Sequence, residues 1–199
     1  NCDIVPRGIY RVGGVILSKE KVFISYENRI LIKYTLVDAH SPTVLRFRPF
    51  LAFRNVNSLC VENYQADTSY QGVSNGISVC MYQGDPNLYM QFNKEVNFVS
   101  TPYWNKGIEY AKELERGYYY KEDLFVPGYF EVPIKKGESV IFSAGVSEVD
   151  TDNLSQIYYE EISKRTARNS FFNCLKNSAQ QCFNRKNPEE LYLLAGYPW

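Results

Sequence analysis

The sequence has very little histidine, and this shortage excludes whole classes of catalytic site. Its only histidine, His40, lies in the segment Asp38–Pro42, whose residues favour a turn. Ser–His–Asp and Cys–His catalysis both need a positioned imidazole as base, and here a single turn residue would have to supply it. We therefore expect no catalytic residue of this kind in the chain.

Paired or clustered cysteines are also lacking. The five cysteines form no CxxC motif and have no histidine nearby, and their odd number argues against a disulfide framework. We expect reduced and mostly buried thiols, no metal site, no cofactor and a cytoplasmic location. These cysteines are Cys2, Cys60, Cys80, Cys174 and Cys182.

The chain has no excess of either charge, because Lys and Arg together number 22 and so do Asp and Glu. A balanced surface creates no field that attracts nucleic acid or an anionic membrane. No apolar run approaches the roughly 18 residues of a membrane span. We expect neither nucleic acid nor membrane as a partner. A neutral polymer such as glucan is compatible with this surface, as is an ordinary soluble surface without a polymer ligand.

Aromatic and β-branched residues are plentiful, and they occur in short runs separated by turn residues. Hydrophobic residues make up 45% of the 199 residues and aromatics 16%, enough for one packed domain and a small appendage. Runs at this spacing without long helices between them predict an antiparallel β-sandwich over residues 1–147. The expected strands are Tyr10–Leu17, Val22–Tyr26, Ile30–Val37, Val44–Phe53 with a bulge or edge at Pro49, Ile77–Tyr82, Leu88–Phe92, Val96–Val99, Tyr129–Ile134 and Val140–Ala144.

After Ser147 the apolar period changes to that of helices. One stripe contains Leu154, Ile157, Tyr158 and Ile162, and a second contains Phe171, Leu175, Ser178 and Cys182. A third helix start is indicated by Asn187–Glu190, with Asn as cap and Pro in the first turn. Residues 148–199 are therefore predicted to form a short helical extension. Either both stripes pack on the sheet, or one lacks its partner in this chain.

The segment Glu115–Glu131, ERGYYYKEDLFVPGYFE, is the richest in functional signals. Aromatic faces beside hydrogen-bonding groups are typical of a surface that stacks on sugar rings, although loop aromatics also serve as lids over a core. The segment Tyr103–Gly107 has the same character, and we expect both aromatic clusters to lie in loops. Arginines at strand and loop ends suit either sugar contact or an interface with another domain. The candidate substrate-binding residues are Trp104, Tyr118, Tyr119, Tyr120, Arg54 and Arg116.

Glu122 and Asp123 are the obvious pair of acids in this segment, but they are poor candidates for glycosidic hydrolysis. That reaction usually needs two carboxyls about 5 to 9.5 Å apart on either side of the scissile bond. Adjacent residues on a strand point to opposite faces, and in a turn both tend to be solvated. No other acids in the region, Glu113, Glu115 or Glu131, can be paired from sequence alone. We assign no catalytic residue.

Three motifs in order resemble one family. ERGYYYKEDLFVPGYFE, LRFRPFLAFRNVN at Leu45–Asn57 and AGYPW at Ala195–Trp199 are similar to glycogen debranching enzymes of the amylo-α-1,6-glucosidase type. The resemblance extends from about Ile9 to Trp199. It implies a supersandwich-like β-domain followed by an (α/α)6 barrel that carries the hydrolytic carboxylates. AGYPW would stand at the entry to that barrel, so the expected catalytic part lies outside this sequence.

The resemblance implies a non-catalytic domain of an enzyme that hydrolyses α-1,6-glucosidic branch linkages. Its implied partners are glycogen or branched α-glucan and its own catalytic barrel, with residues 148–199 as the connector. The family motif often has His where Asn57 stands, so no protonatable role carries over to this position. Two other readings remain, a stand-alone carbohydrate-binding module and a purely structural interaction domain. An unpaired sheet edge could also recruit a second copy and form a homodimer.

Overall fold

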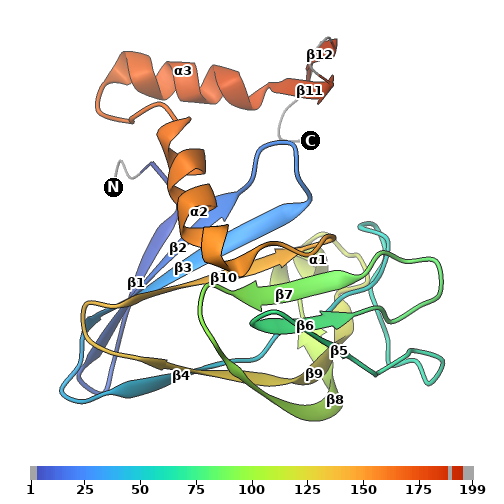
Figure 1. Ribbon diagram of the computed structural model, residues 1–199. Coiled ribbons are helices and arrows are strands. Elements are labelled where there is room, and N and C mark those ends of the chain that lie inside the picture. The colour runs from blue at the N-terminus through green and yellow to red at the C-terminus, as the bar shows by residue number, and fades with distance from the viewer. Residues whose placement is uncertain (1–3, 188–189, 195–199) are drawn as a thin grey trace.

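Seven antiparallel strands form the larger sheet of the computed structural model, which describes residues 4–187 and 190–194. Their order across the sheet brings strands from both ends of the domain together, with β10 between β3 and β7 (Figure 1). In sheet order they are β1 (Arg7–Val12), β2 (Val15–Phe23), β3 (Arg29–Asp38), β10 (Ser139–Gly145), β7 (Leu88–Phe92), β6 (Gly76–Val79) and β5 (Gln71–Val73).

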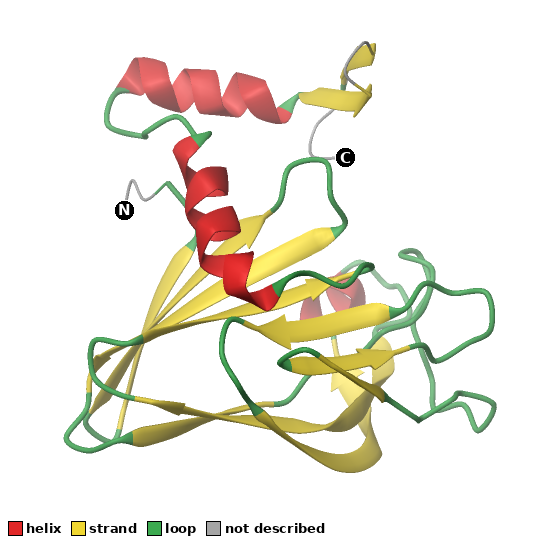
Figure 2. Cartoon of the chain, viewed as in Figure 1, coloured by secondary structure: helices red, strands yellow, loops and turns green. Residues whose placement is uncertain are grey.

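The smaller sheet has three antiparallel strands, and it packs face to face with part of the larger one. Its order is β4 (Thr43–Phe47), β9 (Lys121–Ile134) and β8 (Asn97–Glu109). Between the sheets, Phe92 of β7 meets Phe130 of β9 with ring centroids 5.0 Å apart, and both rings are buried. Inward-facing side chains of both sheets form one apolar core, as alternation along the strands predicts. The expected antiparallel β-sandwich is confirmed (Figure 2).

The first predicted strand is in fact a hairpin. Tyr10–Leu17 contains Gly13 and Gly14, and both have positive φ, of 55° and 82°. Two such residues make the tight turn that reverses an antiparallel pair, so that Val12 lies opposite Val15. The Gly-Gly step was the signal for this turn, and reading the run as one strand was wrong.

Strands β8 and β9 are longer than their apolar runs predict. The expected strands Val96–Val99 and Tyr129–Ile134 are only parts of them, and Tyr103–Gly107 is a strand segment rather than a loop. Two irregularities in register interrupt the pairing of β8 with β9. At Gly128 of β9 the neighbouring backbone approaches so closely that a Cβ would lie 2.2 Å from the carbonyl oxygen of Val99. The glycine of the VPGYF motif is therefore required for this pairing.

Proline limits the strand predicted at Val44–Phe53. β4 ends at Phe47, two residues before Pro49, which has no N–H to offer a ladder. Leu51 rejoins the smaller sheet by a single bridge to Phe125. The chain therefore leaves the sheet at this proline, as the sequence indicated.

Helix α2 (Leu154–Ser163) follows a 3-10 turn at Thr151–Asn153 and lies on the outer face of the larger sheet. The side chain of Asp150 accepts the backbone N–H of Asp152 and so begins the turn. Leu154 and Tyr158 are fully buried, and they pack with Val22, Leu31 and Ile141 of the sheet. The first predicted helical stripe therefore has its partner within this chain.

Helix α3 (Phe171–Gln181) extends away from the sandwich (Figure 1). Ser170 caps it by accepting the backbone N–H of Asn173 at 3.2 Å. Phe171, Phe172 and Leu175 are all exposed to solvent. The second stripe therefore lacks a partner among the described residues.

The third predicted helix is wrong at the residues that the structure describes. Strands β11 (Phe183–Asn187) and β12 (Glu190–Leu193) pair as an antiparallel hairpin around that position. Pro188 and Glu189 lie outside the described residues, as do Cys2 and the AGYPW motif. Asn followed by Pro is compatible with a turn as well as with a helix start, and sequence alone did not separate the two.

The cysteines of the described chain are free thiols. Cys60, Cys80, Cys174 and Cys182 are each half-buried, so they are more accessible than expected. Within residues 4–187 and 190–194, no three His, Cys, Asp or Glu side chains lie where they could hold a metal ion. No helix in this part of the chain is long and apolar enough to cross a membrane.

Candidate functional site

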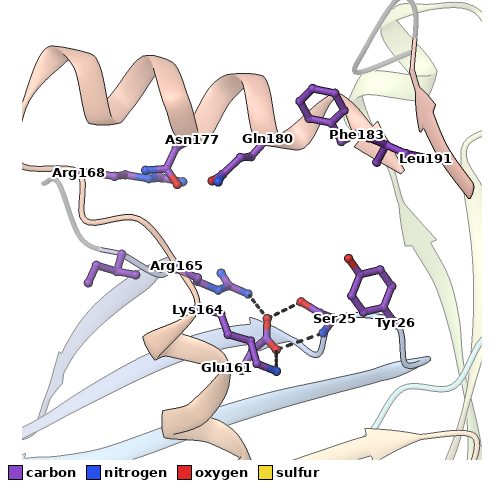
Figure 3. Close-up of a pocket in the computed structure, with 11 residues that line it drawn as sticks. Ser25, Tyr26, Glu161, Lys164, Arg165, Arg168, Asn177, Gln180, Phe183 and Leu191 are labelled. Carbon is purple, nitrogen blue, oxygen red and sulfur yellow. Dashed lines mark hydrogen bonds and ion pairs between the residues drawn. The ribbon is translucent and has the colours of Figure 1, made fainter. Parts of the chain in front are cut away.

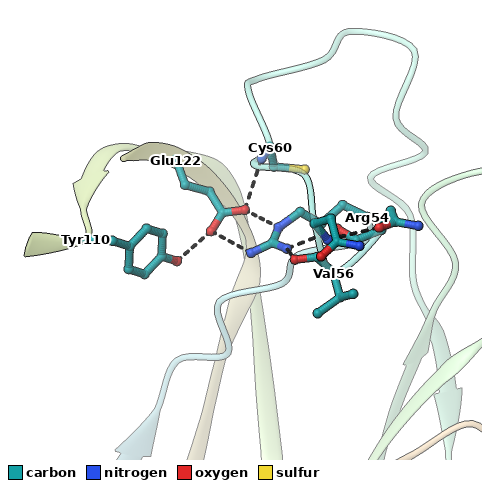
Figure 4. Close-up of polar contacts among 7 residues, drawn as sticks. Arg54, Val56, Cys60, Tyr110 and Glu122 are labelled. Atoms are coloured by element: carbon teal, nitrogen blue, oxygen red, sulfur yellow. Dashed lines mark hydrogen bonds and ion pairs between the residues drawn. The ribbon is translucent and has the colours of Figure 1, made fainter. Parts of the chain in front are cut away.

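A buried carboxylate, Glu122 near the start of β9, organises the most densely bonded polar cluster outside the core. Its side chain is fully buried, and it accepts hydrogen bonds from three directions (Figure 4). Arg54 donates through Nε and, at 3.2 Å, through Nη2. The Tyr110 hydroxyl donates at 2.5 Å and the backbone N–H of Cys60 at 3.0 Å. These donors compensate for the loss of water around the charge.

The charge states of the cluster follow from these contacts. Burial acts to raise the pKa of Glu122, but the bonds from Arg54, Tyr110 and the Cys60 N–H outweigh it and hold that pKa below its ordinary value. The bond to Glu122 raises the pKa of Tyr110 and of Arg54. At neutral pH the cluster is therefore an ion pair of Arg54 with Glu122, joined by a protonated tyrosine.

Arg54 joins the loop after Phe53 to β9. Besides its two bonds to Glu122, its Nη1 donates to the backbone carbonyls of Asn55 at 3.1 Å and Val56 at 3.2 Å. Four of the five N–H groups of the guanidinium are thus used within the protein. Arg54 serves first as a clamp for this loop and has little donor capacity left for a ligand.

Asp123 points to the opposite face of β9 and holds two other segments. Its carboxylate accepts the backbone N–H of Glu62 at 3.0 Å and that of Gly107 at 2.9 Å. These two bonds lower the pKa of Asp123. The two adjacent acids therefore lie on a strand, face opposite ways and are each bonded to the surrounding chain, which does not suit an acid and base acting together.

A pocket of about 660 Å³ opens over the Arg54 clamp. Four of the six predicted site residues, Arg54, Arg116, Tyr118 and Tyr119, line it although they come from distant parts of the sequence. Tyr118 is 59% and Tyr119 65% exposed. Arg116 lies over the Tyr118 ring at 5.1 Å and pairs with Glu113 at 3.4 Å. The remaining lining residues are Val56, Asn57, Leu59, Tyr110 and Glu113.

The other two predicted site residues lie outside this pocket. Trp104 is half-buried on β8 opposite Phe125, with ring centroids 5.6 Å apart, and it packs against the core. Tyr120 is half-buried, and the Lys121 ammonium lies 5.5 Å from its ring centre. The run of three tyrosines is therefore divided between Tyr118 and Tyr119 at the pocket and Tyr120 beside it.

Sequence reasoning missed Tyr110 and did not place Glu113 in the site. Tyr110 immediately precedes helix α1 (Ala111–Glu115), which places its ring beside Glu122. Glu113 was read only as a potential acid, whereas it pairs with Arg116 three residues on. That spacing is a normal helical ion-pair signal. No sequence signal marks Tyr110, because its partner Glu122 lies on β9, twelve residues further along the chain.

The comparison with protein families matches residues 1–141 to the family described as glycogen debranching enzyme N terminal. This chain belongs to that family. The matched range includes both sheets up to the first residues of β10 and every residue that lines the pocket at Arg54. Helices α2 and α3 follow the matched part of the chain.

Among solved structures, the chain is similar to a bacterial glucoamylase whose crystal structure was determined in complex with acarbose. The two are 11% identical, and the TM-score is 0.33. The match covers 81% of this chain but 28% of the glucoamylase chain. A comparison with curated proteins found no match.

Proposed function

We propose that this chain is the non-catalytic N-terminal domain of a glycogen debranching enzyme that hydrolyses α-1,6-glucosidic branch linkages. In this role it supports the catalytic barrel and contacts glycogen or another branched α-glucan at the pocket over Arg54. The observation that carries the proposal is the convergence of Arg54, Arg116, Tyr118 and Tyr119 on one pocket in a member of this family.

The pocket has a hydrogen-bonded base and an exposed aromatic rim, which suits a weak sugar contact. The Arg54–Glu122–Tyr110 cluster fixes the base. Tyr118 and Tyr119 offer exposed ring faces for the apolar side of a pyranose, and Arg116 and Glu113 offer hydrogen-bonding groups for its hydroxyls. Each stacked ring contributes on the order of 0.5 to 1.5 kcal/mol beyond area burial, so we expect a dissociation constant near 1 mM.

A titration with maltoheptaose, followed by backbone amide shifts, tests the glucan contact. We expect saturable shifts around the pocket that disappear when Tyr118→Ala and Tyr119→Ala are combined. Tyr64→Ala is the matched control, because Tyr64 is 94% exposed and does not line the pocket. An equal response in the double variant, or no saturation at tens of millimolar ligand, would leave these tyrosines without a role in binding.

The variant Trp104→Ala tests the prediction that Trp104 contacts sugar, although this residue lies outside the pocket. Because Trp104 packs on Phe125, we expect this variant to be less stable but to retain its affinity for maltoheptaose. A loss of affinity without a loss of stability would restore Trp104 as a sugar contact.

Incubation with a branched limit dextrin tests the non-catalytic part of the proposal. We expect no glucose release above a heat-denatured sample, because Glu122 and Asp123 are both engaged in holding the fold. Glu113 is the partly exposed acid of the pocket. Glucose release that is lost in the variant Glu113→Gln would place an active site here.

The exposed apolar face of α3 supports the role in carrying the barrel, and it favours an interaction domain over a stand-alone carbohydrate-binding module. Phe171 is 81% exposed and Phe172 73%, which is unusual for two adjacent phenylalanines unless another surface covers them. Homodimer formation through this face or a free sheet edge is the alternative, and sedimentation at increasing concentration distinguishes the two.

We also propose a cytoplasmic location, which the four free thiols support.

A further inference from the structure

A second and larger pocket lies between the helical extension and the sandwich, and it shares no lining residue with the pocket over Arg54. Its volume is about 820 Å³, within the range of small-molecule sites. The end of α2 and the loop after it form one wall, α3 a second, and the turn between β2 and β3 a third (Figure 3).

Positive charge dominates this pocket although the whole chain is neutral. Lys164, Arg165 and Arg168 line it, and Glu161 is the only acid among the lining residues that the structure describes. That carboxylate is buried and already bonded, since it accepts the Ser25 hydroxyl at 2.7 Å and the Ser25 backbone N–H at 3.3 Å. Glu161 therefore cannot neutralise three cations, and the pocket keeps a positive potential.

The three cationic side chains differ in how strongly they are bonded within the protein. Arg165 is anchored, because it donates to the backbone carbonyl of Phe23 at 3.1 Å and lies 3.9 Å from Glu161. Lys164 reaches Glu161 at 3.4 Å but is 62% exposed. Arg168 makes no hydrogen bond or ion pair with another described residue, and it lines the pocket together with Asn177 (Figure 3). Lys164 and Arg168 are thus available to an anion entering the pocket.

Neutral hydrogen-bonding groups and an aromatic ring complete the lining. Asn177 donates through Nδ2 to the carbonyls of Thr166 and Asn173, which leaves its side-chain oxygen as an acceptor. Gln180 adds a second amide. Tyr26, in the turn between β2 and β3, lines the pocket with its phenol ring.

We propose that this pocket binds a small phosphorylated sugar. Guanidinium and ammonium groups recognise a phosphate, with arginine able to bind two of its oxygens at once. The amides of Asn177 and Gln180 and the hydroxyl of Tyr26 suit the hydroxyls of a sugar. A ligand held by Arg168 and Lys164 on one wall and Gln180 on another would also fix α3 against the sandwich, to which α3 makes few contacts of its own.

Calorimetric titration of the whole chain at constant ionic strength tests this. The probes are glucose 6-phosphate, inorganic phosphate and glucose. We expect glucose 6-phosphate to bind at least tenfold more tightly than either of the others. Equal binding of inorganic phosphate would overturn the sugar part of the proposal, and no binding of any phosphate would overturn the site.

Substitutions of single residues test whether glucose 6-phosphate binds in this pocket. Arg168→Ala is expected to weaken glucose 6-phosphate at least tenfold, and Arg168→Lys to weaken it less, because the charge remains but the paired donors are lost. Lys176→Ala removes the same charge from an exposed position of α3 that does not line the pocket, and it should leave the affinity unchanged. Arg168 has no hydrogen-bond or ion-pair partner to lose among the described residues, so a folded Arg168→Ala variant with full affinity would refute the assignment.

A second measurement is independent of affinity. Because ligand would connect α3 to the sandwich, glucose 6-phosphate should slow proteolytic cleavage between α2 and α3, and glucose should not. Equal cleavage rates with and without the ligand at saturation would contradict the proposed bridging.

Discussion

Helices α2 and α3 are alike in length and in carrying an apolar stripe, but their surroundings are opposite. Leu154 and Tyr158 of α2 are fully buried against the larger sheet, whereas Phe171, Phe172 and Leu175 of α3 face solvent. Helical periodicity identifies a face that avoids water, and it does not identify what covers that face. α2 follows β10 after a short turn and so reaches the sheet, while α3 begins beyond the further loop at 164–170.

The sandwich and the helical extension also differ in how an arginine of each is bonded. Arg54 in the sandwich is bonded to a buried carboxylate and two carbonyls. Arg168 in the extension has no such partner among the described residues. Arg54 therefore holds the fold of the sandwich, whereas Arg168 remains available for contacts with other molecules.

The largest effect is expected from Arg54→Ala. This change leaves Glu122 buried without its ion-pair partner, and removing one member of a buried pair costs about 3–5 kcal/mol of unfolding free energy. Arg168→Ala should change that free energy by less than about 0.5 kcal/mol. Urea unfolding followed by circular dichroism measures both. Similar losses in the two variants would show that the contrast between the arginines is mistaken.

A Leu→Ala substitution in each helix compares how much the apolar stripe of α2 and that of α3 contribute to stability. Leu154→Ala should lower the free energy of unfolding by about 2–5 kcal/mol, because it opens a cavity between α2 and the sheet. Leu175→Ala, on the exposed face of α3, should cost less than about 0.5 kcal/mol. Equal costs in urea unfolding would mean that α3 is packed in solution.

Acid unfolding should depend on Glu122. Its pKa in the folded protein lies below the ordinary 4.5, so its ionised form contributes stability that is present above pH 4.5 and is lost as pH falls through the depressed pKa. The difference in unfolding free energy between the native chain and Glu122→Gln should therefore shrink as pH falls below 4.5. Glu138→Gln is a control, because Glu138 also has a lowered pKa but a more exposed side chain. A difference that stays constant down to the lowest pH at which the chain folds would contradict this.

The smallest effect on stability is expected from Phe171→Ser combined with Leu175→Ser. Because both side chains face solvent, the melting temperature should hardly change, while self-association and binding of a hydrophobic dye should decrease. Light scattering and dye fluorescence measure these. A marked fall in melting temperature would indicate that the stripe already packs on another surface.

The class of fold could be predicted from sequence because alternation and turn residues are local properties. The limits of the strands were harder to predict: β1 and β2 are separated by the Gly13–Gly14 turn, and β8 continues through Tyr103–Gly107 because it pairs with β9. Pairing between strands is a tertiary property that no local pattern reports. For the same reason Asn187 and Glu190 gave a helix signal where a hairpin forms.

The sequence predicted the types of residue in the candidate site, but only four of the six expected residues line the pocket. Arg54, Arg116, Tyr118 and Tyr119 meet, because Glu122 fixes Arg54 beside the segment that follows α1. Trp104 was expected with them, but its register opposite Phe125 turns its ring onto the core. Tyr110 could not be predicted, because its hydrogen bond to Glu122 on β9 leaves no mark in the sequence.

The central position of β10 in the larger sheet has a consequence during synthesis. Among the described strands, β1, β2 and β3 reach the rest of that sheet only through β10, where Ser139 pairs with Thr35 about a hundred residues earlier. At roughly 5–20 residues per second, a ribosome needs on the order of 5–20 s to make the intervening chain. During that interval the three nascent strands have a free edge and no opposing sheet. A chaperone that shields strand edges would be most useful to this chain in that interval, before Gly145 emerges from the ribosome.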